Sequence, residues 1–325
     1  MLLPALAILG GFILLVWSAD RFVDGAAAVA KHLGLPSLLI GMVIVGFGTS
    51  APEMVVSAMA AVDGNPALAL GNGLGSNIVN VSLILGATAV IAPIVVHSKI
   101  IKKEIPLLMA LSLLTGFFLW DLSLTFVESL ILLAGFFILV GWSIYAALNN
   151  KGDALESEFE EELASHAMSL GKGLFWLALG LAVLIGSSRI LVWGSVEIAT
   201  ILGVSNLIIG LTIVALGTSL PELAASIIAA RKGEHDIAIG NVIGSNMFNL
   251  LAVIGIAGVI EPMYNLEAEV LWRDWPVMTG LMVLLLVLAF GFGKEHKLSR
   301  FGGMILLSTY IAYNAYLVQS VVAAA

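Results

Sequence analysis

Two glutamates lie within long apolar stretches of the sequence, where a carboxylate has to leave water. Each ends the pattern Gly-Thr-Ser-x-Pro-Glu, at Glu53 and at Glu222. A charged side chain at the centre of a membrane-spanning helix costs about 2.5–3.5 kcal/mol on insertion scales, so such residues usually have a function. The alternative is a protonated or hydrogen-bonded glutamate that only fixes helix packing. Because the same costly residue occurs twice in the same context, we favour a functional pair.

A proline directly precedes each glutamate. Pro52 and Pro221 cannot donate a backbone N–H, and each ring clashes with the carbonyl of the glycine four residues earlier. Irregular backbone at membrane depth is tolerated only where it is buried in protein or lines a polar cavity. Interrupted helices that are paired between repeats indicate an intramembrane binding site. We therefore expect both helices to be interrupted beside the glutamates, with a simple proline kink as the alternative.

Small polar side chains near both glutamates offer only hard oxygen donors to a cation. Ser76 and Asn80 are four residues apart and share a helix face, as do Ser245 and Asn249. Hard oxygens are the ligands that Ca²⁺ and Na⁺ prefer, and the absence of cysteine makes soft metals poor candidates. The candidate side-chain ligands are Glu53, Glu222, Thr49, Ser50, Thr218, Ser219, Ser76, Ser245, Asn80 and Asn249.

Two alternatives apply to these polar residues. Serine and threonine routinely mediate close packing between membrane helices, often beside glycine. Asn77 and Asn246 point about a third of a turn away from their neighbours on a helix, so we expect them to bond to backbone between helices and rank them below Asn80 and Asn249.

The composition shows which elements must hold these residues. With 60% hydrophobic and 11% charged residues over 325 positions, the chain cannot cover a water-soluble globule with polar side chains. A membrane-spanning helix needs about 20 mostly apolar residues. We predict an all-α integral membrane protein with ten transmembrane helices: 2–30, 36–61, 66–92, 104–120, 124–148, 171–200, 205–230, 235–260, 272–292 and 300–321.

The two halves of the chain repeat at a constant offset of 169 residues. Residues 46–57 align with 215–226 and residues 71–80 align with 240–249, and twelve of these 22 pairs are identical. The chain is thus divided into a first repeat (1–148), an acidic cytoplasmic linker (149–170) and a second repeat (171–325). Five helices per repeat is an odd number, so the second repeat must enter the membrane from the opposite face. We predict two inverted five-helix repeats.

The loop charges agree with this inversion. Matched loops of the two halves carry contrasting charge, as where Asp63 aligns with Lys232. Cytoplasmic loops accumulate Lys and Arg. Eleven of the fourteen basic residues fall on one side: Lys31, Lys99, Lys102, Lys103, Lys151, Lys172, Arg231, Lys232, Lys294, Lys297 and Arg300. Both termini are therefore predicted to face outward, the periplasm in a Gram-negative cell, with the chain multi-pass in the plasma (inner) membrane.

Other charges also fall inside predicted helices. Asp20, Arg21 and Asp24 lie together in the first helix, and Arg189 lies in the sixth. We expect local pairing or snorkelling of these side chains to the membrane interface.

The paired elements carry a family resemblance. Each Gly-Thr-Ser-x-Pro-Glu element is followed by Gly-Asn-x-x-Gly-Ser-Asn-x-x-Asn, and in both halves this resembles the α-repeats of the cation/Ca²⁺ exchanger superfamily. The sequence also resembles bacterial Ca²⁺/Na⁺ antiporters of the YrbG type, which have ten helices and no large regulatory domain.

The resemblance implies which residues bind the ions. Glu53 and Glu222 would be shared carboxylate ligands, and Asn80 and Asn249 would occupy remaining ligand positions. Many relatives carry Asp where this chain has Asn249, so one negative or protonatable group is absent here. The serines Ser50, Ser219, Ser76 and Ser245 and the carbonyls of Gly46, Thr49, Ala215 and Thr218 would complete the Na⁺ and Ca²⁺ sites.

The resemblance and the residues together give a functional hypothesis, which is a secondary active antiporter that exchanges Ca²⁺ for Na⁺ by alternating access, with the first and sixth helices sliding past the four central ones. The alternative within transporters is a cation/H⁺ exchanger in which the two glutamates bind protons. A passive channel would also use carboxylates.

An intramembrane enzyme is disfavoured because no His or Cys lies near the two elements in sequence. Beyond Ca²⁺, Na⁺ and the lipid bilayer, we expect no cofactor, no nucleic acid and no obligate protein partner.

Overall fold

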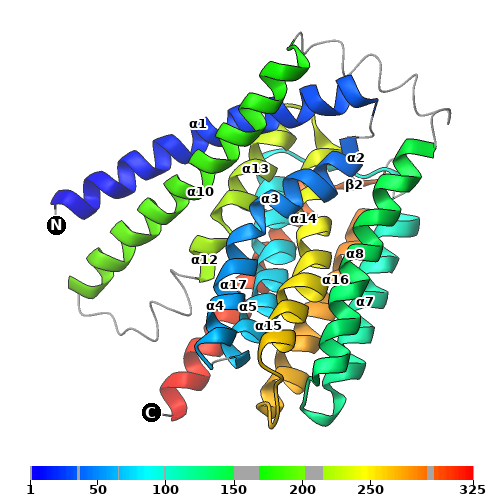
Figure 1. Ribbon diagram of the computed structural model, residues 1–325. Helices are drawn as coiled ribbons and strands as arrows, with labels where there is room; N and C mark the ends of the chain where they lie inside the picture. The colour runs from blue at the N-terminus through cyan, green and yellow to red at the C-terminus, as the bar shows by residue number, and fades with distance from the viewer. Residues whose placement is uncertain are drawn as a thin grey trace.

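A computed structural model describes residues 2–34, 37–64, 66–98, 100–149, 168–201, 215–290 and 296–324. Helices make up nearly all of these residues (Figure 1). In the first half they are α1 (Leu2–Leu33), α2 (Ser37–Leu39), η1 (Ile40–Val45), α3 (Gly46–Thr49), α4 (Ala51–Val62), α5 (Pro66–Val79), η2 (Asn80–Leu85), α6 (Gly86–Ile91), η3 (Ile100–Glu104), α7 (Ile105–Phe118), η4 (Leu119–Asp121) and α8 (Phe126–Asn149). In the second half they are α10 (Leu170–Ile201), α12 (Ala215–Thr218), α13 (Leu220–Arg231), α14 (His235–Phe248), η6 (Asn249–Val253), α15 (Ile254–Ile260), η7 (Val270–Asp274), α16 (Trp275–Phe290) and α17 (Arg300–Ala324).

Eight helices in the described residues are long and apolar enough to cross a membrane, or nine if one bent pair counts as a span. Most predicted ranges agree with the structure to within a few residues, and 235–260 coincides with α14 through α15. Of the predicted helix 205–230, residues 205–214 lie outside the described residues, as does most of the linker 149–170. The count of ten therefore stays a prediction.

Two short β pairings, which the prediction of an all-α protein did not include, accompany the helices. Strand β1 (Ile94–Val95) pairs antiparallel with β2 (Lys297–Leu298), and an isolated bridge joins Leu124 to Met263. Both pairings join loops of opposite halves, so no local hydrophobic period predicts them. In Figure 1 the strand pair lies at the upper end of the bundle and the loop after α15 at the lower end.

The two pairings accompany a cross-wise packing of the halves. The third helix of the second half, α15, packs against α8 of the first, and α17 of the second half packs against α6 of the first. Ile94 and Met263 are related by the 169-residue offset (94 + 169 = 263). Each half therefore completes the other.

Helices α1 and α10 form a separate antiparallel pair that crosses the bundle at a tilt (Figure 1). Glycines allow close approach of the two backbones: a β carbon on Gly25 would meet Leu177, and one on Gly194 would meet Ile8 at 3.1 Å. These two contacts are related by the same offset (25 + 169 = 194; 8 + 169 = 177). Small residues at the interface are the usual basis of helix association in membranes.

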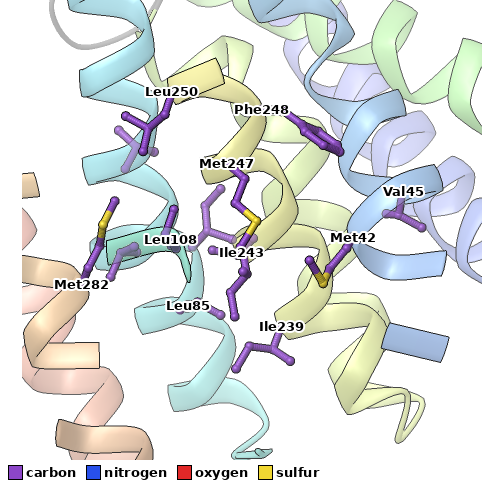
Figure 2. Close-up of a cluster of buried hydrophobic side chains, with 14 of the residues drawn as sticks. Met42, Val45, Leu85, Leu108, Ile239, Ile243, Met247, Phe248, Leu250 and Met282 are labelled. Atoms are coloured by element: carbon purple, nitrogen blue, oxygen red, sulfur yellow. The ribbon is translucent and has the colours of Figure 1, made fainter. Parts of the chain in front are cut away.

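The centre of the bundle is built from the helices that carry the Gly-Ser-Asn motifs. Most of the span His235–Ile260 is buried within the protein (83% of the most apolar window), whereas the span Arg300–Gln319 is largely on the outside (17%). In Figure 2, apolar side chains of α14 reach Leu85 and Leu108 on one side and Met42 on the other. This dry packing surrounds the polar residues described next.

Candidate cation site

Both helices that carry a glutamate are interrupted where the prolines predicted. Helix α3 ends before Ser50 and α4 starts after it, and the axes of the two parts differ in direction by 45°. In the second half the break falls at Ser219, between α12 and α13. Pro52 and Pro221 occupy the first turn of the new helix, where a missing N–H costs nothing. The predicted interruption is confirmed in both halves.

The two breaks bring the glutamates together. Glu53 and Glu222 are each 1% exposed. The Ser50 hydroxyl, three residues before Glu53, donates to Oε1 of Glu222 at 3.3 Å, and the two glutamates interact electrostatically. The Oε2 atom of each carboxylate is buried without a hydrogen-bond partner among the described residues. Two carboxylates from opposite halves therefore share one buried region.

Two asparagines donate hydrogen bonds to the backbone carbonyls of the two glutamates. The Asn72 amide donates to the carbonyl of Glu53 at 3.3 Å and to the Ser57 hydroxyl at 2.9 Å. Asn241 repeats this arrangement in the second half, with the carbonyl of Glu222 at 3.3 Å and the Ser226 hydroxyl at 2.9 Å. Its amide oxygen also accepts from Thr49 at 3.0 Å. The sequence analysis did not assign these residues a role, although the identity of Asn72 and Asn241 at the repeat offset was a usable signal.

Hydrogen bonds between four asparagines join the helix of α5 and η2 to the helix of α14 and η6. Asn80 donates to Oδ1 of Asn246, and Asn249 donates to Oδ1 of Asn77, both at 3.1 Å. Asn77 also donates to the backbone carbonyl of Asn246 at 3.2 Å, so its predicted backbone bond is confirmed. Asn80 and Asn249 each begin a π-helical segment, a feature that occurs often at functional sites. Their Oδ1 atoms are buried and have no partner in the part of the chain that the structure describes.

The remaining predicted ligands differ in whether their oxygens already accept or donate hydrogen bonds within the protein. Ser219 Oγ is buried and unpartnered in the described structure, and Ser76 is 5% exposed. The carbonyl of Gly46 accepts the Ser50 N–H at 3.0 Å and the Ser245 hydroxyl at 3.4 Å, so in this conformation hydrogen bonds occupy it. Ala215 and Thr218 lie at the two ends of α12, beside the second break.

The donors form one region of hard oxygens. Helix α4, which carries Glu53, contacts η6, and α13, which carries Glu222, contacts η2. A buried polar group without a partner costs about 1–3 kcal/mol. Five such oxygens occur here: Glu53 Oε2, Glu222 Oε2, Ser219 Oγ, Asn80 Oδ1 and Asn249 Oδ1. Because no three His, Asp or Glu side chains gather anywhere in the described residues, a cation would be held here by two carboxylates and neutral oxygens.

Asn241 provides a direct test of how this region is held. Replacing Asn241 with Ala removes three hydrogen bonds and leaves buried partners unsatisfied. We expect a loss of about 1–3 kcal/mol of stability and a weaker affinity of the site for a cation, because the Glu222 segment loses its hydrogen bonds. Thermal unfolding in detergent and a cation-binding titration measure the two effects. Asn314→Ala is the control, since the side chain of Asn314 donates to the carbonyl of Tyr310, one turn earlier on the same helix, and an equal effect there would contradict the assigned role.

Comparison with known proteins shows the family to which this chain belongs. The family described as Sodium/calcium exchanger protein matches residues 3–145 and 172–319. The putative antiporter CaxA of Alkalimonas amylolytica is 46% identical over 98% of this chain and 100% of its own length. The inner membrane protein YrbG of Escherichia coli K12 is 36% identical over 98% of this chain and 97% of its own. The solved structure of the sodium-calcium exchanger NCX_Mj covers 97% of this chain and 98% of its own, with a TM-score of 0.82 and 29% identity. The chain therefore belongs to the sodium/calcium exchanger family.

Proposed function

We propose that this protein exchanges Ca²⁺ for Na⁺ across a membrane by alternating access. The observation that carries the proposal is the pair of buried carboxylates, one from each half, among oxygens that lack protein partners in the described structure. Membership of the sodium/calcium exchanger family supports the choice of ions. We assign Glu53 and Glu222 as shared ligands of both ions, with the hydroxyl, amide and carbonyl oxygens named above completing the shell.

Electrostatics explains why binding of one ion would exclude the other. Two carboxylates neutralise one Ca²⁺ or two Na⁺, so either loaded state relieves the buried charge. The empty site keeps two anions close together in a medium of low dielectric constant, where their repulsion is much larger than in water. An unloaded transporter is therefore discouraged from changing its access state, which couples the two fluxes.

The proposed architecture is a pair of inverted repeats with ten membrane spans. Its support is the recurrence of contacts at the 169-residue offset: the two asparagine anchors and the hydrogen bonds between the four asparagines Asn77, Asn80, Asn246 and Asn249 recur in this way. The positions of the two cross-half pairings at opposite ends of the bundle also favour inversion. From the loop charges we propose that both termini lie outside the cell, or in the periplasm for an inner membrane.

The proposed movement is a shift of the α1–α10 pair over the central helices. The pair is symmetric within itself, because its glycine contacts recur at the repeat offset. The packing of the pair against the rest of the protein is asymmetric: α1 packs along α13, whereas α10 makes no comparable contact with α4 in the described residues. Because the two repeats are related by inversion, the packing of α1 on α13 has an equivalent alternative in which α10 packs on α4. We assign these two packing arrangements to the two access states.

Transport into liposomes tests the coupling ion. Purified protein in vesicles loaded with Na⁺ should take up ⁴⁵Ca²⁺, and uptake should fall to the background of empty vesicles when internal Na⁺ is replaced by choline. Uptake driven by a pH gradient without Na⁺ would instead support cation/H⁺ exchange. Uptake that needs no counter-ion would indicate a channel and contradict exchange.

A further inference from the structure

An ion-pair cluster joins the α1–α10 pair to the end of α13. The Lys232 ammonium lies 2.7 Å from a carboxylate oxygen of Asp20 and 2.7 Å from one of Asp24, and it donates to the Asp20 carbonyl at 3.1 Å. The two aspartates are one turn apart on α1, and Lys232 directly follows α13. Both aspartates pair with Lys232, a residue more than 200 positions away, which the expectation of local pairing or snorkelling did not include. The cluster therefore connects the α1–α10 helix pair, which we expect to move, to the rest of the protein.

The same positions in the other repeat carry the opposite charges. Asp20 corresponds to Arg189 on α10 (20 + 169 = 189), and Lys232 corresponds to Asp63 at the end of α4 (63 + 169 = 232). A second ion pair of swapped sign is thus encoded. In the described residues neither Arg189 nor Asp63 forms an ion pair, and both are exposed.

The structure explains why only one of the two pairs is made. Helix α1 packs against α13, which brings Asp20 close to Lys232. Among the described residues α10 does not pack against α4 in the equivalent way. Lys232 and Asp63 follow the ends of α13 and α4 that point to opposite ends of the bundle (Figure 1). A shift that packs α10 against α4 would separate Asp20 from Lys232 and bring Arg189 toward Asp63.

We propose that these two ion pairs are alternate latches of the transport cycle. Lys232 with Asp20 and Asp24 holds the α1–α10 pair in the conformation described here, and Arg189 with Asp63 holds it in the opposite access state. The proposal rests on the proposed alternating-access function. It adds five positioning residues that lie outside the cation site and do not touch the transported ion.

The strength of such latches suits this role. Lys232 and Asp20 are partly exposed, with 23% and 39% of their side-chain surface accessible. Ion pairs of this kind shift an equilibrium by up to about fivefold. They can therefore bias the two states without trapping either. Position 193, which corresponds to Asp24, is Trp193, so the second latch has one carboxylate fewer and is expected to be the weaker.

Paired cysteines test the geometry, because the native chain contains no cysteine. We expect a short bifunctional thiol reagent to link Asp24→Cys with Lys232→Cys and, in a separate variant, Asp63→Cys with Arg189→Cys. The control is Arg189→Cys with Glu261→Cys, which should not be linked because α10 does not pack against α15 in the described residues. Linkage of the first pair without any linkage of the second, with Ca²⁺, with Na⁺ or with neither, would overturn the proposal.

Neutralising one latch tests the electrostatics. Lys232→Gln should raise the linking rate of the Asp63/Arg189 cysteine pair by up to about fivefold, and Asp63→Asn should raise that of the Asp24/Lys232 pair by a smaller factor. High salt should remove both effects. Unchanged rates, or changes in the same direction for both pairs in each variant, would overturn the latches. Because linking is measured without Ca²⁺ transport, a latch failure in protein that still exchanges Ca²⁺ for Na⁺ leaves the proposed function standing.

Discussion

Glu53→Gln and Glu222→Gln are each expected to abolish Na⁺-driven ⁴⁵Ca²⁺ uptake in liposomes. Each substitution removes one of the two buried charges while changing little volume. The substitution breaks the buried ion pair between the bound cation and that carboxylate, which costs about 3–5 kcal/mol and corresponds to a loss of affinity of roughly 100-fold or more. In Glu222→Gln the new side-chain amide oxygen can still accept the hydrogen bond from Ser50, so the contact between the halves is kept.

The controls separate charge from folding. Glu261→Gln makes the same chemical change at an exposed residue that follows α15, and it should leave uptake unchanged. Elution as a single symmetric peak in size-exclusion chromatography shows that the inactive variants are folded. If either inner variant kept full exchange, that glutamate would not be part of the site and the two-carboxylate mechanism would be wrong.

Gly244→Val is expected to have the largest effect on stability. A β carbon on Gly244 would meet the backbone of Met42, including its carbonyl oxygen, and backbone atoms cannot move aside as a flexible side chain can. Overpacking of a core typically costs about 1–3 kcal/mol, and we expect at least the upper part of this range here. The variant should show a strongly lowered unfolding temperature in detergent or fail to accumulate in the membrane.

Gly71→Ala is the matched control for this substitution. Gly71 lies on α5, within the motif that Gly240-Asn repeats in the second half, but a β carbon there meets no atom within 4 Å. Replacing an open helical glycine by alanine is expected to stabilise by up to about 1 kcal/mol. A Gly244→Val protein as stable as the native one would show that η1 and α14 do not pack as described.

The sequence predicts the parts of this protein that depend on local pattern. The interruptions at Ser50 and Ser219 follow from the prolines two residues later, and the boundaries of most helices follow from apolar length. The burial of Glu53 and Glu222 follows from their place in apolar stretches, and the structure agrees. These features need no knowledge of which helices are neighbours.

The features that sequence reasoning missed are contacts between distant segments. Asn72 and Asn241 were visible as repeated residues, but a side-chain amide can bond to so many partners that its role depends on tertiary packing. The same holds for Lys232, whose carboxylate partners lie on α1. The carbonyl of Gly46 was expected to be a ligand by resemblance, yet in this conformation it accepts hydrogen bonds from Ser50 and Ser245.

The cross-wise packing of the halves has a consequence for biogenesis. Helix α6 packs against α17, which follows it by more than 200 residues, and α8 packs against α15. During synthesis the first half therefore leaves the ribosome before the surfaces that will cover it exist. We therefore expect the two halves to reach a stable structure only after both have been inserted, rather than to dock as two finished domains.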